Sequence, residues 1–599
     1  MLTALFSQSA SAGWRILAGA SLLFFLSSQL AQAAQDSPAA NPSNAVSAPA
    51  KAQAPAAAKP AAPTQPPPPP APATPQAQAI QALIKSGTLP KLRYGRFSDH
   101  QAHLETLYQS SGYAPLWTQA GKATAQAQKT IASLATADEK GLNSADYDAE
   151  WLRKAFDGVT TANAQDAAAF DVALSLSLMR YASNLYMGRI NPRQVNFNLD
   201  IAPKKMDLPA LLHKLAANDK PDALLDGLEP KLKLYEYLKR ALAQYRQLAA
   251  DNPTVSIKLP DKFKPGSRHA DVPTLRKFLA TVGDLTEGNT ADTSPVYDPA
   301  LVAAVKRFQA RHGLTVDGII GKPTLTQLNV PLAERVTQIQ LGLERLRWLP
   351  EHIKGRHLIA NVPSFQLFGY HTGAEQDRPD LEMNVIVGEA IDGRNTPVFH
   401  SDMTYVNFRP YWNVPDTIIA KEYVPVLRRN PAYLNKQNME LVTNYALDAK
   451  PHAATRENVE RLASGSLKLR QKPGPKNALG LVKFTFPNTN NVYLHSTPSQ
   501  SLFKRTRRDF SHGCIRVELP VKLAEFVLKD EVEWKQQKIE EAMHGDATKI
   551  VTLKTPIPVY IFYSTVLADA DGRAMFYQDL YGHDAILAEQ LAKGFPYPK

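Results

Sequence analysis

The sequence predicts a multidomain α+β protein, because three stretches of the chain differ in character. Residues from about 80 to 260 carry apolar side chains at helical spacing. Residues 261–331 combine amphipathic helical patterns with closely spaced glycines. From residue 351 the pattern changes to short alternating or apolar runs, which are typical of strands. We therefore expect a helical domain, a small three-helix domain and a β-rich domain with a helical insertion.

The N-terminus, residues 1–33, has the features of an export signal. Arg15 precedes an apolar run over 16–26, and Ala31-Gln32-Ala33 offers small residues for cleavage. The run is shorter than the ~20 residues of a membrane span, which favours a cleaved signal over an uncleaved anchor. Residues 34–79 form an Ala- and Pro-rich linker that buries too little to fold. It serves either as a spacer or as disordered filler.

The formal net charge of +12 suits an anionic partner. Nucleic acid is not the expected partner, because the sequence has no zinc-finger spacing, no RNP-like aromatic run and no long basic tract.

Residues 80–260 are predicted to form a helical scaffold domain without catalytic groups. Apolar residues recur at helical spacing over 170–181, and Gly188 marks the end of that helix. Trp117 and Trp151 fit core positions better than ligand contacts.

Residues 261–331 are predicted to hold helices over 272–282 and 299–312 and a third helix after Gly321. His312 and Asp317 fit a helix-terminal histidine and a turn-capping aspartate better than metal ligands. Residues 332–350 are expected to form a helix that returns to the scaffold, so that the three-helix unit is an insertion.

Residues 351–566 are predicted to form the β-rich domain, a sandwich or barrel-like sheet. The expected strands lie in 357–362, 384–388, 398–406, 483–486 and 492–495. Residues 420–475 look helical and loop-like, and we expect them to cover the sheet as a lid. Residues 567–599 remain as a C-terminal tail.

The chain has one cysteine, Cys514, so no intramolecular disulfide can form. Exported proteins usually pair their thiols or lack them. A lone thiol is therefore either an inert buried residue or a working nucleophile. Cys514 follows His512 and Gly513, and His495 lies nineteen residues upstream. This combination favours the nucleophile.

Thiolates attack carbonyl carbons well once a nearby histidine or positive charge lowers their pKa. Arg507, Arg508 and Arg516 supply positive charge nearby. Backbone N–H groups around Gly513 and Cys514 could face a developing oxyanion.

Zinc is the other chemistry open to Cys514, together with His512 and His495. It is disfavoured because His512 and Cys514 are two positions apart and no second cysteine exists.

His495, fifteen intervening residues and Ser511-His512-Gly513-Cys514 resemble the signature of the L,D-transpeptidases with a YkuD-type catalytic domain. Other motifs are similar to the larger YcbB-like branch; they lie at 410–415, 473–480, 483–484, 487–488, 493–495 and 511–516. Arg516 replaces the asparagine of many smaller members. Residues 305–321 resemble the three-helix peptidoglycan-binding domain, which either binds the wall or acts as a spacer.

The resemblance implies a periplasmic enzyme that forms 3-3 peptidoglycan cross-links. Cys514 would attack the carbonyl at the L-centre of diaminopimelate in a tetrapeptide stem, and the terminal D-alanine would leave. The side-chain amine of a second diaminopimelate would then resolve the thioester. Carbapenems would acylate the same thiol. The chemistry requires no metal or organic cofactor.

The resemblance also assigns roles to individual residues. His495 would be the base, and the Ser496 carbonyl would orient it. Tyr493 and the backbone of His512, Gly513 and Cys514 would shape the oxyanion site. Substrate contacts are expected from Arg516, Ser511, Trp412, Asn477 and Arg508. Ser511 and Arg516 could instead support the loop, and Trp412 could equally be a core aromatic.

Four other functions stay open at this point. Water as acceptor would give an L,D-carboxypeptidase; a lipoprotein lysine would give an anchoring enzyme, and a free D-amino acid an exchange enzyme. An inactive wall-binding protein belongs to another class. Expected partners are stem peptides and glycan strands, with glycan polymerases and D,D-carboxypeptidases as candidates. Membrane contact is expected only through the signal or anchor.

Overall fold

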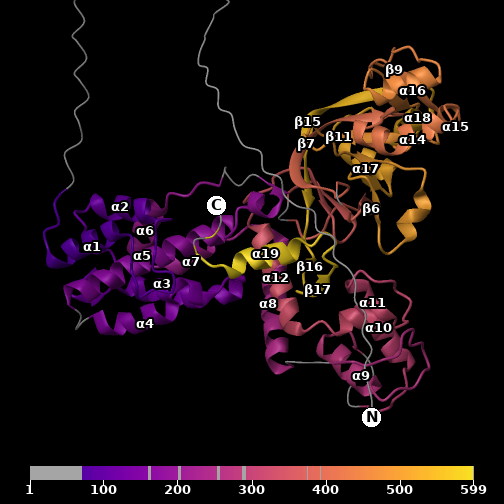
Figure 1. Cartoon of the computed structure of the whole chain (residues 1–599). Helices are drawn as coiled ribbons and strands as arrows, with labels where there is room; N and C mark the ends of the chain where they lie inside the picture. The colour runs from indigo at the N-terminus through magenta and orange to yellow at the C-terminus, as the bar shows by residue number, and fades with distance from the viewer. Residues whose placement is uncertain are drawn as a thin grey trace, which may run out of the picture. The chain divides into compact units, whose positions relative to one another are not determined.

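The computed structural model describes the chain from residue 70 onward (Figure 1). Within that span it does not describe 160–162, 200–203, 253–255, 287–291, 374–375, 392, 596 and 598–599. The predicted signal and the linker up to residue 69 lie outside the described residues. Among those residues, the helices are too short or too polar to cross a bilayer.

The first helix, α1 (Pro75–Ser86), begins inside the span predicted to be linker. The Thr74 side chain accepts a hydrogen bond from the Ala77 N–H, and Pro75 occupies the first turn. Both are strong helix-start signals, and Ala77 is itself buried. The sequence analysis did not recognise these signals, because the Ala- and Pro-rich composition of this stretch indicated a linker.

The helical scaffold is built around α5, whose side chains are buried on nearly every face. Its helices are α1, α2 (Gln101–Gln109), α3 (Ala125–Ala135), α4 (Ala149–Gly158), α5 (Ala164–Met187), α6 (Leu208–Ala217), α7 (Pro221–Asp226) and α8 (Lys233–Asp251). Trp117 is fully buried there, as predicted, and its indole N–H donates to Ser175 Oγ. Trp151 is half-buried and packs against the same core.

A three-helix unit follows, formed by α9 (Val272–Thr281), α10 (Pro299–Arg311) and α11 (Lys322–Leu328). His312 lies 2.7 Å from the Phe308 carbonyl through Nδ1 and stacks on the Phe308 ring. Asp317 accepts the Ile319 N–H in a turn. Both residues therefore hold structural positions, as the sequence predicted.

After the three-helix unit the chain returns to the scaffold through α12 (Leu332–Leu346), which packs on α8. Glu344 of α12 is fully buried and accepts hydrogen bonds from the backbone N–H groups of Arg189 and Ile190. These contacts tie α12 to the chain that follows α5.

The C-terminal residues are folded, although the sequence suggested only a tail. They form β16 (Val566–Ala568), β17 (Ala574–Phe576) and α19 (His583–Ala592). Arg345 of α12 pairs with Asp584 of α19 at 2.5 Å. These elements are short and take their stability from packing on α12, which no local pattern reveals.

The β-rich domain is a sheet whose strand order, β11-β12-β14-β6-β5-β4-β15-β7, closes when β7 pairs with β11. The strands are β4 (His357–Asn361), β5 (Gln366–Tyr370), β6 (Leu381–Gly388), β7 (Val398–Phe408), β11 (Val482–Thr485), β12 (Leu494–His495), β14 (Ile515–Val517) and β15 (Lys549–Phe562). On its margin, β3 (Phe197–Asn198) pairs with β7, and β13 (Asp509–Ser511) pairs with β6. Two helices, α17 (Pro520–Val527) and α18 (Gln536–His544), contribute to its core. The sheet is barrel-like, as one of the predicted alternatives.

The insertion predicted to be helical and loop-like contains a small sheet as well as helices. Its sheet is β8 (Trp412–Asn413), β10 (Lys468–Gln471) and β9 (Met439–Val442), and its helices are α13 (Asp416–Ile418), η5 (Ile419–Tyr423), α14 (Val424–Arg429), α15 (Tyr433–Lys436) and α16 (Arg456–Ala463). All four residues of β9 are buried, so the strand lacks the alternation that would have identified it.

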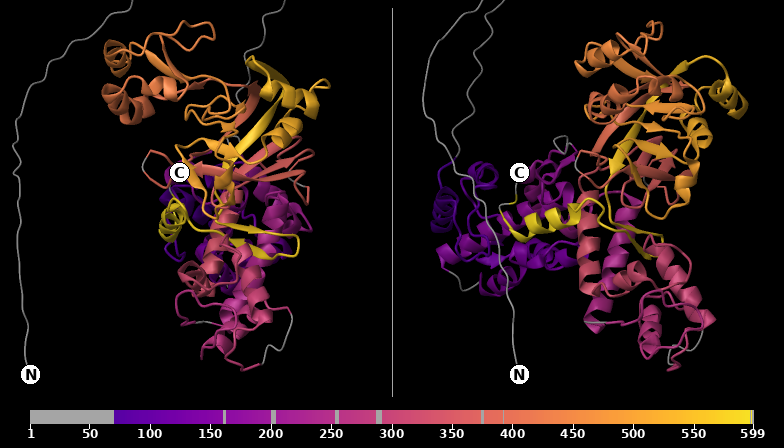
Figure 2. Two further views of the ribbon diagram at one scale, coloured as in Figure 1. Left: turned by 90° about the vertical axis from the view of Figure 1, so that its right-hand side faces the viewer. Right: turned by 45° about the vertical axis from the view of Figure 1, so that its right-hand side comes forward.

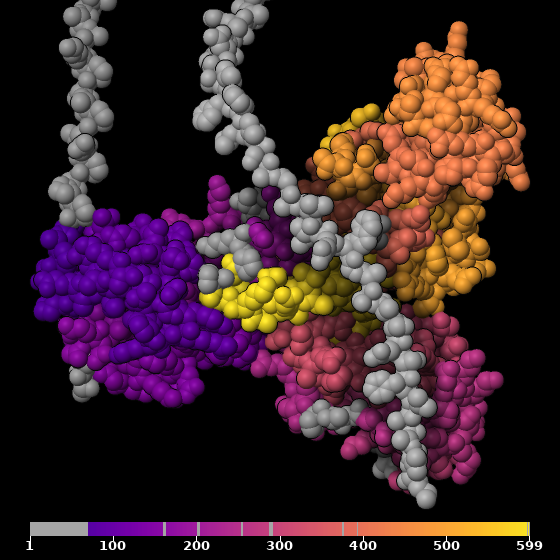
Figure 3. All heavy atoms as spheres, viewed as in Figure 1, coloured from indigo at the N-terminus to yellow at the C-terminus, as the bar shows by residue number. Residues whose placement is uncertain are grey.

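The insertion has its own core, which includes Leu427, Val459 and Leu469. Figure 1 and Figure 2 show its elements gathered in one orange lobe, which is also visible in the surface view of Figure 3. We refer to residues 412–471 as the lid.

Candidate active site

The candidate site lies on one face of three adjoining strands, β11, β12 and β14. In their register Lys483 pairs with His495, and His495 pairs with Arg516. Successive side chains of a strand point to opposite faces of the sheet. The intervening residues, including Leu494 and Ile515, are fully buried in the core. The other face therefore carries Lys483, His495 and Arg516 side by side.

Tyr493 and Cys514 extend this face, because each lies two positions before a residue on it. The Ile515 N–H donates to the Tyr493 carbonyl at 3.1 Å, which holds the two segments together. The Tyr493 ring meets the His495 ring edge-on, with centroids 5.7 Å apart. The predicted nucleophile Cys514, the predicted base His495 and the Tyr493 side chain thus lie on one face of the sheet.

The Cys514 thiol is half-buried and directs its S–H toward the Asn491 carbonyl oxygen, 3.5 Å away. Asn491 has a positive φ of 55°, an uncommon conformation for a residue with a side chain. Sequence reasoning missed Asn491, because it contributes only a backbone oxygen.

His495 is held in one orientation. Its Nδ1 lies 2.6 Å from the Ser496 carbonyl oxygen. A carbonyl can only accept, so Nδ1 carries the proton and Nε2 is left with a lone pair. Burial, together with the nearby charges of Arg516 and Lys483, lowers the pKa of His495 to about 3. The imidazole is therefore neutral and able to take a proton.

The thiol is also neutral before substrate arrives. Burial raises the pKa of Cys514, while Tyr493, Lys483 and Arg516 oppose the rise. We expected the neighbouring charges to lower the thiol pKa, and here the loss of hydration outweighs them. Cys514 and His495 are accordingly both uncharged.

Lys483 is a charged group of the site that the sequence analysis did not assign. Its Nζ lies 3.8 Å from the centre of the Tyr493 ring. Burial lowers the pKa of Lys483, and Cys514 acts in the opposite direction. The alternation Lys483-Phe484-Thr485-Phe486 already placed this lysine opposite the core face.

The loop that carries the nucleophile is fixed by backbone contacts. Gly513 has a φ of +114°, which residues with side chains rarely adopt. Thr396 Oγ1 donates to the Gly513 carbonyl and accepts the Gly388 N–H, both at 2.8 Å. Ser511 Oγ donates to the Cys514 carbonyl at 2.5 Å and accepts the Gly513 N–H at 3.2 Å. Ser511 thus supports the loop.

These contacts determine which backbone N–H groups are free to bind an oxyanion. The Gly513 N–H is already bonded to Ser511. The Cys514 N–H makes no hydrogen bond within the described part of the chain. Of the two donors expected to face an oxyanion, the Cys514 N–H is therefore the open one.

The His512 ring contacts the lid. Its Nε2 lies 2.7 Å from Glu422 Oε1, and Glu422 also accepts from Arg394 at 3.0 Å. Arg394 donates in turn to Glu389 at 2.8 Å. We call His512, Glu422, Arg394 and Glu389 the lid contact. Glu422 and Arg394 both lie far from His512 in the sequence, so no sequence motif could predict that the three residues meet.

His512 is consequently not placed with Cys514 and His495 as a set of zinc ligands. The described residues also contain no cluster of three or more His, Cys, Asp or Glu side chains arranged to hold a metal ion.

Trp412 brings the edge of the lid to the site. It is half-buried, and its ring lies 6.3 Å from that of Tyr423, also in the lid. Burial raises the pKa of Tyr493 well above its usual range, Cys514 adds to the rise, and the Trp412 indole hydrogen bond opposes it. Trp412 and Cys514 therefore both adjoin the Tyr493 hydroxyl.

Two residues expected to bind substrate are engaged with the backbone instead. Asn477 is 1% exposed, and its amide donates to the carbonyls of Pro410 and Lys472. Arg508 donates to the Phe365 carbonyl at 3.0 Å and to Asn384 Oδ1 at 2.9 Å. Both side chains fix chain segments around the site.

Arg516 supports the loop, which is one of its two expected roles, and its contact with substrate stays a prediction. Its Nη2 donates to the Phe510 carbonyl at 3.3 Å, which supports the loop, and its charge acts on Cys514 and His495.

Three family profiles match separate parts of the chain. Residues 355–559 match the L,D-transpeptidase catalytic domain known as YkuD, which contains every candidate site residue. Residues 268–328 match a peptidoglycan binding domain, and residues 102–242 match a scaffold domain.

A curated Haemophilus influenzae protein, named as an L,D-transpeptidase, is 30% identical over 262 residues, which is 44% of this chain. The match spans half the length of that relative. A crystal structure of an L,D-transpeptidase from Stackebrandtia nassauensis aligns with 13% identity over 51% of this chain and 97% of its own, at a TM-score of 0.18. At that TM-score the alignment adds nothing to the fold argument.

Proposed function

We propose that the protein forms 3-3 cross-links between peptidoglycan stems in the periplasm, on the basis that residues 355–559 match an L,D-transpeptidase catalytic domain. The observation that carries the proposal is the shared strand face of Cys514 and His495, with the His495 Nδ1 fixed by the Ser496 carbonyl. A peptidoglycan binding domain in the same chain supports the polymer as substrate.

In the first half-reaction, Cys514 Sγ attacks the carbonyl carbon at the L-centre of the third residue of a tetrapeptide donor. The thiol proton passes to His495 Nε2 as the carbon–sulfur bond forms. The Cys514 N–H and the Tyr493 hydroxyl face the oxyanion. The bond to D-alanine then breaks, His495 returns the proton to the departing amine, and a thioester remains on Cys514.

In the second half-reaction, the side-chain amine of another stem attacks the thioester carbonyl. His495 removes a proton from the attacking amine, the carbon–sulfur bond breaks, and the proton returns to sulfur. An amide bond between two stems forms and the free thiol is regenerated. A neutral thiol and a neutral imidazole suit this cycle, because the whole cycle begins and ends with a proton on sulfur and an uncharged His495.

The positive charges of Lys483 and Arg516 would stabilise the negative charge that develops on sulfur and oxygen in both half-reactions. They adjoin a half-buried site, where an electrostatic contact is stronger than in water. The lid would favour the amine over water as acceptor, because it limits access of solvent to the thioester.

The test is product analysis by mass spectrometry after the full chain is incubated with purified tetrapeptide muropeptides. We expect dimers joined through diaminopimelate, and none with Cys514→Ala. Shortened monomers in place of dimers would indicate an L,D-carboxypeptidase, and incorporation of an added D-amino acid an exchange enzyme. No turnover, with retained binding to sacculi, would indicate a wall-binding protein.

A further inference from the structure

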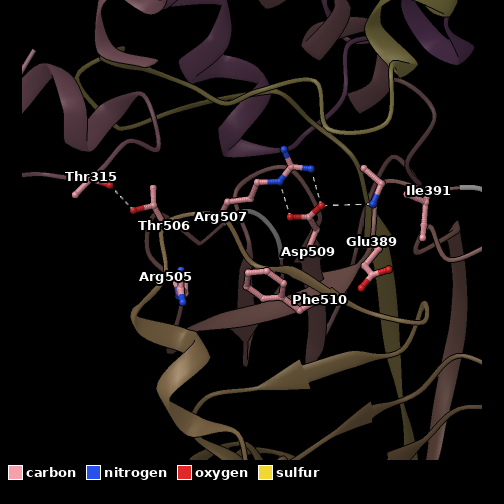
Figure 4. Close-up of a pocket in the computed structure, with 9 residues that line it drawn as sticks. Thr315, Glu389, Ile391, Arg505, Thr506, Arg507, Asp509 and Phe510 are labelled. Atoms are coloured by element: carbon pink, nitrogen blue, oxygen red, sulfur yellow. Dashed lines mark hydrogen bonds and ion pairs between the residues drawn. The ribbon is translucent and has the colours of Figure 1, made fainter. Parts of the chain in front are cut away.

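A cleft of about 920 Å3 separates the three-helix unit from the catalytic domain. One wall comes from the turn after α10 and the start of α11, and the other from residues 503–508, just before the nucleophile loop. The walls touch where Thr315 Oγ1 and Thr506 Oγ1 lie 2.8 Å apart (Figure 4). A hollow of about 580 Å3 adjoins the cleft and shares Thr315 and Thr506 with it.

The charged side chains that line this cleft are all cationic. Its lining includes Lys322, Lys504, Arg505, Arg507 and Arg508, and no aspartate or glutamate. Two of these cations are already engaged: Arg507 makes a two-point ion pair with Asp509, and Arg508 binds backbone carbonyls. Lys322, Lys504 and Arg505 are exposed and form no ion pair with any described residue.

The walls of the cleft are held in place without a ligand. Asp284 of the three-helix unit is fully buried between Arg311, at 2.5 Å, and Arg573 of the hairpin formed by β16 and β17, at 3.1 Å. His312 stacks between Phe308 and Phe576 of the same hairpin. A preformed site loses less conformational entropy on binding than one that must first assemble.

The rest of the lining suits a long polar chain. Amide and hydroxyl groups of Gln327, Gln366, Gln578 and Ser364 line the cleft among the cations. Such groups bind sugar hydroxyls and peptide amides, while lysine and arginine bind carboxylates. A polymer that carries peptides with free carboxylates combines both features.

We propose that this cationic cleft binds the carboxylate-bearing peptides of a peptidoglycan strand and holds the strand next to the nucleophile loop. The proposal rests on the proposed function for the identity of the polymer. The adjoining hollow reaches Phe510, which immediately precedes the loop Ser511–Cys514 in the chain. A strand in the cleft therefore lies close to the chain segment that carries Cys514.

Binding is tested with the full chain carrying Cys514→Ala, so that no turnover occurs. The probes are purified sacculi and a disaccharide-tetrapeptide, the latter also with its carboxylates converted to amides. For Lys322→Glu with Arg505→Glu we expect about tenfold weaker binding of the free-carboxylate probe at low ionic strength. The difference shrinks as salt is added, because exposed charges are screened.

The matched control is Lys277→Glu with Arg378→Glu, which reverses two exposed cations outside the cleft. It should bind within twofold of the parent. Parent-like binding by the cleft variant, equal loss in both double variants, or undiminished binding of the amidated probe would overturn the proposal. So would binding to anionic lipid vesicles that exceeds binding to sacculi and disappears in the cleft variant.

Failure of the proposed function is a separate result. It would appear as absence of cross-linked dimers from the Cys514-intact parent, whatever the binding data show. The Cys514-intact cleft variant should still form the acyl-enzyme once the muropeptide is saturating, because its two substitutions lie outside the strand face that carries Cys514 and His495.

Discussion

At the scale of single residues, the proposed mechanism uses two neutral groups in place of the preformed ion pair of many thiol enzymes. Burial lowers the pKa of His495 to about 3 and raises that of Cys514. Both shifts have the same largest cause, because each charged form loses hydration at the sheet face. A neutral thiol must lose its proton as it reacts, so an acylating ligand should react with Cys514 while His495 accepts that proton.

A carbapenem, as a strained acylating agent, should form one covalent adduct, on Cys514. Intact-mass spectrometry should show the added mass in the parent and none in Cys514→Ala. An adduct that persists in the alanine variant would remove Cys514 from its role.

Lys483→Met should slow cross-linking about tenfold, equal to ~1.4 kcal/mol of transition-state stabilisation. Lys483 lowers the pKa of Cys514, so its removal should shift the pH profile of thiol alkylation to higher pH. Lys483→Arg keeps the charge and serves as the control.

If the methionine variant kept the alkylation profile of the parent, Lys483 would be only a packing partner of Tyr493. The arginine variant separates the two roles, because it restores charge with a different shape.

At the scale of elements, the lid contact joins the nucleophile loop to the insertion. Glu422 accepts hydrogen bonds from both His512 and Arg394, and it is the only residue of the lid contact that belongs to the lid. Its loss should let water reach the thioester more often without altering the nucleophile itself.

Glu422→Gln should raise the ratio of hydrolysis to cross-linking about two- to fivefold, the range expected from one partly exposed ion pair. The ratio is measured by mass spectrometry of shortened monomers and dimers. Glu460→Gln is the matched control, because Glu460 forms an exposed ion pair with Arg428 within the lid. Equal ratios in the two variants would mean that the lid contact does not control water.

At the scale of the whole molecule, Asp284 couples the three-helix unit to the C-terminal hairpin. Asp284→Asn leaves Arg311 without its buried counter-ion, so we expect a loss of about 3 kcal/mol in the docking of that unit. Hydrogen–deuterium exchange should rise in α10 and β17. Asp571→Asn, at an exposed position of the same hairpin, should leave exchange unchanged.

Unchanged exchange in Asp284→Asn would show that the aromatic stack of His312, Phe308 and Phe576 holds the unit by itself. The cationic cleft would still be preformed, and Asp284 would have no part in it.

Much of this arrangement was predictable from local sequence. Period-two runs predicted the strands that carry Lys483 and His495, and the lone cysteine beside His512 and Gly513 predicted the nucleophile. The same reasoning failed at β9, which is buried on both faces, and at the C-terminal elements, whose stability comes from α12.

The sequence by itself determined the order of the domains and the strands that carry Lys483 and His495, and it predicts Cys514 as the nucleophile, because alternation and side-chain chemistry are local properties. Tertiary structure alone decided that His512 meets Glu422, that Asn477 and Arg508 hold backbone segments, and that cations from the three-helix unit and the catalytic domain line one cleft. These outcomes depend on contacts between residues distant in the chain, and hydration lost on folding set the protonation of Cys514 and His495.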